Sequence, residues 1–212
     1  MKAQLILENG MRFSGTLFGA EKNIVGEVVF TTGMTGYQET LTDPSFAGQI
    51  VTMTYPLIGN YGINLEDMES RKPFLKGFVV REKCDVPNNW RCEMNLDDFL
   101  QQNKIMGIEG IDTRALTRVL RENGTMKGII TTRVDDLTPS QIKQKFDTYT
   151  NAYAVKEVTI DEPYTINGIG THFAVLDCGI KQNILRDLSK RGCKLSVFPA
   201  FTSADEILSV NP

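Results

Sequence analysis

The stretch TTGMTGYQETLTDPS, residues 31–45, lies between two apolar runs and decides how the N-terminal half of the chain folds. The run at 25–30 precedes it and the run at 49–55 follows it, and both are rich in the residues that favour β-strands. Gly33 and Gly36 let the backbone leave the first strand through conformations that are costly for other residues. The sequence therefore predicts a compact connection between two strands.

A short helical turn is expected within this connection. Thr35 and Gln38 have the spacing of a capping box, which predicts a helical start near Gly36. The turn should end before Asp43, because the residue ahead of a proline is biased out of the helical region. Ser45 then lies on the exit loop, where it either caps a turn or offers its hydroxyl to a ligand.

Composition describes an ordinary globular protein. The 212 residues are 41% hydrophobic and 23% charged, with a net charge of −3, which gives no electrostatic footprint for nucleic acid or an anionic membrane. No apolar run approaches the roughly 20 residues that span a bilayer, and the apolar segment at the N-terminus is too short for a signal peptide. Four scattered cysteines indicate free thiols rather than a disulfide framework, and thus a cytoplasmic protein.

Further strands and helices follow on both sides of the central stretch. An Asn9-Gly10 turn predicts a hairpin of residues 3–8 and 11–18, and short strands are expected at 77–80 and 127–132. Three helices should begin after the caps Asn95, Asp112 and Thr138. The loop around Trp90, the single tryptophan, is expected to be anchored by burial of that side chain.

Three arginines lie on one side of the helix that follows Asp112. Arg114, Arg118 and Arg121 are spaced to point away from the predicted apolar face. Such a stripe is either a solvated surface or a contact for an acidic partner, and the sequence leaves both readings open.

The pattern changes after residue 170. Residues 151–170 indicate a connector, and from His172 an apolar run predicts a buried parallel strand, followed by a helix to about Lys190 and another strand. This is the opening βαβ unit of a doubly wound sheet. The fold class is therefore α/β, with a domain at 1–150 and an incomplete second domain at 171–212.

Cys178 is the most tempting chemical group. It follows a strand and precedes a helix, a position that favours the thiolate. A cysteine hydrolase also needs a base, but His172 lies six residues earlier on the same strand, roughly 20 Å away. We therefore interpret Cys178 as a packing residue. Cys84, Cys92 and Cys193 have no zinc-site spacing, and no phosphate-binding glycine loop with a lysine is present, so neither metal nor ATP is expected on this chain.

Two long blocks carry a resemblance to a known family. GEVVFTTGMTGYQETLTDPSFAGQIVTMTYPLIGNYGIN, residues 26–64, and DTRALTRVLRENG, residues 112–124, resemble the small, glutaminase subunit of carbamoyl phosphate synthetase. The similarity extends in order along the whole chain. It implies a layered β/β/α N-terminal domain followed by the start of a class I glutamine amidotransferase domain.

The resemblance also implies a function. In the family, the intact small subunit hydrolyses L-glutamine through a cysteine thioester and supplies ammonia to a large subunit, which carries ATP and metal and makes carbamoyl phosphate for arginine and pyrimidine biosynthesis. The nucleophile of a Gly-x-Cys-x-Gly elbow would lie beyond Pro212, so this chain alone is expected to be inactive. Ser45 matches the family serine that reaches the bound glutamine. The alternative is a non-catalytic docking module for a synthetase subunit.

Overall fold

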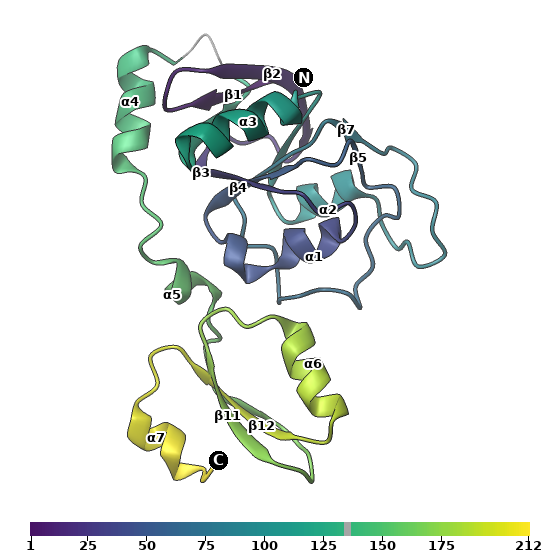
Figure 1. Cartoon of the computed structure of the whole chain (residues 1–212), viewed down its shortest axis with the longest axis vertical. Coiled ribbons are helices and arrows are strands. Elements are labelled where there is room, and N and C mark those ends of the chain that lie inside the picture. Colours follow the sequence, from purple (N-terminus) through teal and green to yellow (C-terminus); the bar gives the residue numbers. More distant parts are fainter. Residues whose placement is uncertain (134–136) are drawn as a thin grey trace.

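The computed structural model describes residues 1–133 and 137–212. Seven strands in its N-terminal part form a closed barrel in the order β1-β2-β8-β6-β4-β3-β9 (Figure 1). The barrel strands are β1 (Lys2–Leu7), β2 (Arg12–Gly19), β3 (Ile24–Thr31), β4 (Gln49–Met53), β6 (Gly77–Val79), β8 (Met106–Glu109) and β9 (Met126–Thr131).

The first two strands form the predicted hairpin. β1 and β2 pair antiparallel, with Leu5 opposite Phe13, and Gly10 takes a φ of 87° in the turn between them. Glycine is suited to this turn because a positive φ is costly for residues with a Cβ. β1 also pairs antiparallel with β9, with Leu5 opposite Ile130, so it has a neighbour on each side.

The central stretch folds as a strand, a helix, a single 3₁₀ turn and a strand. β3 leads into α1 (Tyr37–Thr42), then η1 (Pro44–Phe46) and then β4, and β3 and β4 pair in parallel. The predicted helical turn and its end before Asp43 are confirmed. Because parallel neighbours need a crossover, α1 and η1 lie at one rim of the barrel.

Two apolar clusters fill the N-terminal part. One packs α3 (Thr113–Asn123) on the barrel through Leu116 and Leu120. The other packs α2 (Leu96–Gln102) and α1 against strands β4 and β6, with Phe78 fully buried. The predicted caps are confirmed, because the side chains of Asn95 and Asp112 accept from the N–H groups of residues 98 and 115.

Four further elements lie outside the barrel sheet before the C-terminal residues. β5 (Leu57–Ile58) pairs in parallel with β7 (Glu82–Lys83) outside the barrel sheet. α4 (Pro139–Thr148) begins at a complete capping box of Thr138 and Gln141, as the sequence predicted. A short helix, α5 (Ala154–Val158), follows it.

The C-terminal residues form a separate small sheet, which Figure 1 shows below the barrel. β11 (His172–Asp177) runs parallel to β12 (Lys194–Pro199), and α6 (Gln182–Lys190) connects them, which confirms the predicted strand, helix and strand. β10 (Tyr164–Ile166) adds an antiparallel edge, and α7 (Ala204–Ser209) follows β12. The predicted connector 151–170 thus contains α5 and β10, and β10 belongs to the C-terminal sheet.

The predicted capping box at Thr35 and Gln38 is wrong. The helix cap is Gly36, which has φ 77° and ψ 31° and makes no side-chain capping bond. Gln38 is buried and its amide pairs with the backbone of Asn64, a partner 26 residues away. A tertiary contact has replaced the local one.

The predicted burial of Trp90 is also wrong, because the side chain is 91% exposed. Its loop is held by polar contacts instead, since the adjacent Arg91 pairs with Glu66 and Asp67. The Arg91 guanidinium lies 6.0 Å from the centre of the Trp90 ring.

The predicted burial of β11 holds only in part. Phe173 and Leu176 are 41% and 46% exposed. β11 is an edge strand in the order β10-β12-β11, so it has a neighbouring strand on one side only. The small core of this unit is formed mainly by Leu185, Leu195 and Val197.

Candidate functional site

The candidate site lies where η1 meets the turn between β11 and α6. Asp43 begins η1, and one of its carboxylate oxygens accepts from the Ser45 N–H at 2.9 Å. The other oxygen lies 2.6 Å from the ammonium nitrogen of Lys181, just ahead of α6. A single carboxylate therefore caps the turn that carries Ser45 and joins it to the C-terminal unit.

Ser45 is exposed at this junction. The capping oxygen of the turn belongs to Asp43, so the reading of Ser45 as the turn cap is wrong. Its hydroxyl has no hydrogen-bond partner within residues 1–133 and 137–212. The Ser45 hydroxyl is thus free to donate to or accept from a bound molecule.

The turn after β11 is fixed by a buried carboxylate. Asp177, 3% exposed, accepts from the N–H groups of Gly179, Ile180 and Ile160 at 2.8–2.9 Å. Charge-assisted bonds of this kind are stronger than neutral ones and hold the turn in one conformation.

Gly179 is required in this turn for two reasons. Its φ is 102°, which disfavours any side chain. A Cβ there would also lie 2.8 Å from Val158 and 3.4 Å from the Cβ of Pro44. The C-terminal unit therefore approaches η1 closely, at the residue directly after Cys178.

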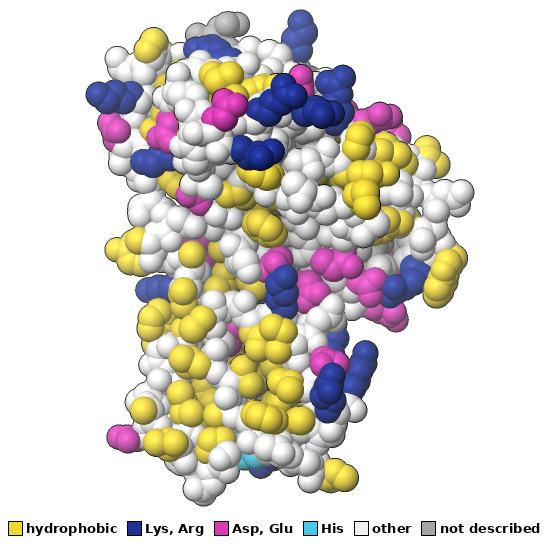
Figure 2. Space-filling view, viewed as in Figure 1, with side chains coloured by type: hydrophobic (Ala, Val, Ile, Leu, Met, Phe, Trp, Pro, Cys, Tyr) yellow, Lys and Arg dark blue, Asp and Glu magenta, His cyan; other side chains and the backbone are white. Residues whose placement is uncertain are grey.

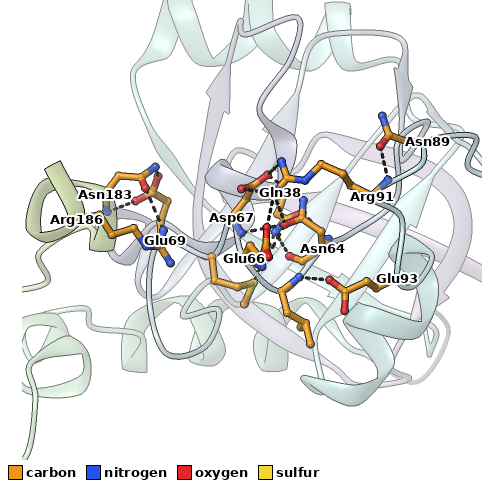
Figure 3. A network of polar contacts seen from close by, with 12 residues as sticks. Gln38, Asn64, Glu66, Asp67, Glu69, Asn89, Arg91, Glu93, Asn183 and Arg186 are labelled. Atoms are coloured by element: carbon orange, nitrogen blue, oxygen red, sulfur yellow. Dashed lines mark hydrogen bonds and ion pairs between the residues drawn. The ribbon is translucent and has the colours of Figure 1, made fainter. Parts of the chain in front are cut away.

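Glu69 makes a second connection between the two parts. Its carboxylate accepts from the backbone N–H of Asn183 at 3.2 Å and from the side-chain amide of the same residue, and its carbonyl accepts from the Gln182 N–H at 2.8 Å (Figure 3). Its own N–H donates to the Thr42 hydroxyl at 2.9 Å, at the end of α1. Glu69 itself is only 4% exposed, so its side of these bonds is shielded from water.

The segment that carries Glu69 is held at its other end by a polar network, also drawn in Figure 3. The Gln38 amide bonds both backbone groups of Asn64, and the Asn64 side chain donates to Asp67 at 2.9 Å. Arg91 makes two bonds to the Asp67 carboxylate, at 2.8 and 2.9 Å. The hydrogen bond from Arg91 is the main reason that the pKa of Asp67 is lowered from its ordinary value.

Two tyrosines complete the support of α1. The rings of Tyr37 and Tyr61 stack with their centres 4.0 Å apart, and the Tyr61 hydroxyl accepts from the Tyr37 N–H at 3.0 Å. Burial raises the pKa of both phenols. They remain neutral through the physiological range and act as packing and hydrogen-bonding groups.

Cys178 and His172 lie at opposite ends of β11. His172 is at the start of β11, where its Nε2 lies 2.9 Å from the Ser196 hydroxyl, and Cys178 follows the end of the same strand. The interpretation of Cys178 as a packing residue is wrong, because it is exposed at the turn. The turn leaves the side chain outside the small core.

Among residues 1–133 and 137–212, no group of three or more His, Cys, Asp or Glu side chains is arranged to hold a metal ion. In the same part of the chain, no helix has the length and apolar character needed to cross a membrane.

Sequence reasoning missed most of the junction. Glu69 lies in the acidic run of residues 66–69, which is evident in the sequence, but the sequence does not show which residues its carboxylate would bind. Its partners on α6 are more than 110 residues away, and Lys181 is similarly distant from Asp43. Only the folded chain brings these groups together.

Comparison with known proteins identifies related sequences. The family profile described as "Carbamoyl-phosphate synthase small chain, CPSase domain" matches residues 5–130. A carbamoyl phosphate synthase small chain from Clostridium perfringens is 59% identical over all of this chain and 60% of the relative. A pyrimidine-specific small chain from Halalkalibacterium halodurans is 50% identical over all of this chain and 58% of its own length. The chain thus spans about three fifths of the curated relatives it matches.

Among solved structures, an aminopeptidase from Aneurinibacillus sp. strain AM-1 overlaps 61% of this chain and 30% of its own. The TM-score is 0.35 at 16% identity, and a likeness of this size carries no argument.

We expect Glu69→Ala to loosen α6 from the N-terminal part. Bonds to a charged group contribute about 1.5–3 kcal/mol each, so the free energy of opening at the Asn183 amide should fall by about that amount. Hydrogen exchange measures this directly. Glu122→Ala is the control, because Glu122 is an exposed residue of α3 that lies outside the junction and outside the network around Asp67. Equal protection of Asn183 in the two variants would contradict the assigned role of Glu69.

We expect a pH dependence from Asp67. Its pKa is lower when folded than the ordinary 3.8, so its contribution to stability is complete above about pH 4–5 and is lost as pH falls through the folded pKa. Arg91→Gln removes the main cause and should raise the pKa of Asp67 in an NMR titration of the carboxyl carbon. Arg12→Gln, at an exposed arginine of β2, should leave it unchanged. An unaltered pKa in Arg91→Gln would show that another group lowers it.

Proposed function

Because the chain belongs to the carbamoyl-phosphate synthase small chain family, we propose that it is part of a subunit that hydrolyses glutamine and supplies ammonia to a large subunit. The observation that carries this proposal is the match of the family profile to residues 5–130, together with relatives named as small chains that align over the whole chain. The ammonia would serve carbamoyl phosphate synthesis. The large subunit would bind ATP and metal, and the pathways served would be arginine and pyrimidine biosynthesis.

We propose the domain division that the sequence indicated. Residues 1–150 would form the N-terminal domain, for which the family resemblance implies layered β/β/α packing, and 151–170 the connector. Residues 171–212 would begin a doubly wound class I amidotransferase domain. The separation of the apolar clusters of the barrel from that of the C-terminal sheet supports this division. We also propose a cytoplasmic location, where four free thiols would stay reduced.

Within this function, we propose that Ser45 contacts the glutamine. The substrate has a carboxylate and an amine that need polar partners, and ligand clefts commonly form at domain junctions. Three features support the assignment: the hydroxyl is exposed, Asp43 supplies the turn cap in its place, and Pro44 lies against Gly179. A hydroxyl can bond to either end of the substrate without adding charge.

The rival function is a non-catalytic docking module for a synthetase subunit, with the activity wholly in other chains. One specific observation favours it for these 212 residues: they contain no Gly-x-Cys-x-Gly elbow, and the exposed Cys178 has no histidine base beside it. A cysteine nucleophile needs such a base within hydrogen-bond reach. The two functions differ in whether the chain itself turns over glutamine.

We expect Ser45→Ala, in the small chain expressed from its complete gene, to weaken glutamine binding. The loss of one neutral hydrogen bond costs about 0.5–1.5 kcal/mol, or up to about 3 kcal/mol if its partner is charged. Ammonia-driven synthesis by the large subunit should be unchanged, because that route bypasses glutamine. Ser140→Ala, at an exposed serine of α4, is the control. The Michaelis constant for glutamine is the measurement, and an unchanged value would remove Ser45 from the substrate site.

We expect the 212-residue chain by itself to release no ammonia from glutamine. The physical reason is the separation of Cys178 from His172, which pairs with Ser196 instead. A coupled ammonia assay measures the turnover, with Cys178→Ser beside it. Turnover that is abolished by Cys178→Ser would make Cys178 the nucleophile and overturn both the expectation and the assignment of the elbow to residues after Pro212.

A further inference from the structure

A basic hollow of about 680 Å³ lies beside α3, away from the junction that holds Ser45. Four arginines line it, together with hydroxyl groups from two neighbouring loops: Arg81, Arg114, Arg118, Arg121, Thr32 and Thr54. Figure 2 shows Lys and Arg side chains gathered over this upper part of the molecule, with hydrophobic side chains next to them.

The arginines converge because of how α3 packs. Leu116 and Leu120 face the barrel core, so the side chains at the i, i+4 and i+7 positions that begin with Arg114 point to solvent. Arg81 comes from a different element, the bend after β6, and its guanidinium lies 3.5 Å from the carbonyl oxygen of Gly110. Two separate parts of the chain thus supply one cationic surface.

The positive charge of the hollow is not neutralised within the described chain. Among residues 1–133 and 137–212, no carboxylate lies within 4.0 Å of any of the four guanidinium groups. Asp112 also lines the hollow, but its carboxylate is the helix cap and accepts from the Ala115 N–H. The whole chain carries a net charge of −3, so this local cluster of four cations is opposite in sign to the net charge of the protein.

The surroundings of the hollow have the composition of a protein interface. Tyr55, between two residues that line the hollow, is 39% exposed, and Met34, on the loop that begins at Thr32, is 74% exposed. Arginine, tyrosine and methionine are enriched in the centres of protein–protein interfaces, where lysine and glutamate are depleted. Exposed apolar side chains beside unpaired arginines fit a protein surface better than they fit a small charged molecule.

We propose that this hollow is the docking surface for an acidic segment of the partner chain, with carboxylates seated between the arginines. The inference rests on the proposed function for the identity of that partner, the large synthetase chain. Each guanidinium can hold a carboxylate through two parallel hydrogen bonds, which fixes the orientation of the partner as well as attracting it. Since the hollow is open to solvent, the attraction is screened by salt.

The test uses the small chain expressed from its complete gene and its purified large chain. The triple variant Arg114→Gln, Arg118→Gln, Arg121→Gln should bind the large chain at least about tenfold more weakly at low ionic strength, mainly through slower association. Its Kd should also respond less to added salt than that of the wild type. The charge-matched control is Lys143→Gln, Lys156→Gln, Lys190→Gln, three exposed lysines on α4, α5 and α6.

Three outcomes would overturn the inference, and each has a distinct meaning. If both triple variants bind as tightly as wild type, the partner docks elsewhere and the proposed function stands. If the wild-type small chain does not bind the large chain at all, the proposed function falls with the inference. If pyrophosphate binds the free small chain through these arginines and the triple variant still docks normally, the hollow is a small-anion site.

Folding of the variants is checked separately. The exposed arginines make no ion pair in the described chain, so the melting temperature and the glutaminase activity of the triple variant should equal those of wild type. If the triple variant fails to fold, the single variant Arg118→Gln is measured in its place. A single variant with wild-type affinity and wild-type salt response would overturn the inference.

Discussion

The hydrogen bonding of β9 between β1 and β3 is the interaction on which the rest of the structure depends. It joins the N-terminal hairpin to the strand that precedes α1, and so closes seven strands into a barrel without free edges. Closure leaves β3 only one side on which to pair β4, and the parallel pairing requires the crossover through α1 and η1. The position of Ser45 at the barrel rim follows from that constraint.

The rim then becomes a junction through a small number of buried carboxylates. Asp43, Glu69 and Asp177 each accept from groups distant in sequence or fix a turn that faces them. Buried carboxylates of this kind are stable only when their acceptor sites are filled, so the contacts also define a single geometry. This explains how a C-terminal sheet with only a small apolar core is held against the barrel.

The polar network around Asp67 and the stacked tyrosines have a supporting role. They hold the segment before Glu69 to α1. A substitution in the network or at either tyrosine would therefore shift Glu69 without removing any contact of the junction itself. The arginine face of α3 is independent of this system, since its side chains lie on the opposite side of that helix from the buried Leu116 and Leu120. Under the two proposals, one surface of the barrel would face the substrate and another would be available to a partner.

The sequence by itself determined most of the elements, three of the helix caps and the family, because periodicity, capping and turn chemistry are local and act over a few residues. The hairpin at Asn9-Gly10, the caps Asn95, Asp112 and Thr138 and the strand–helix–strand unit after His172 were all predictable on that basis. Local rules do not predict contacts between distant residues, and tertiary structure decided these. Gln38 pairs with Asn64 in place of a capping box, and Trp90 is exposed. Asp43 pairs with Lys181 just ahead of α6, and Glu69 binds Asn183 on α6. Each of these depends on groups that are distant in sequence, and the free energy of such a contact exists only once the chain has folded around it.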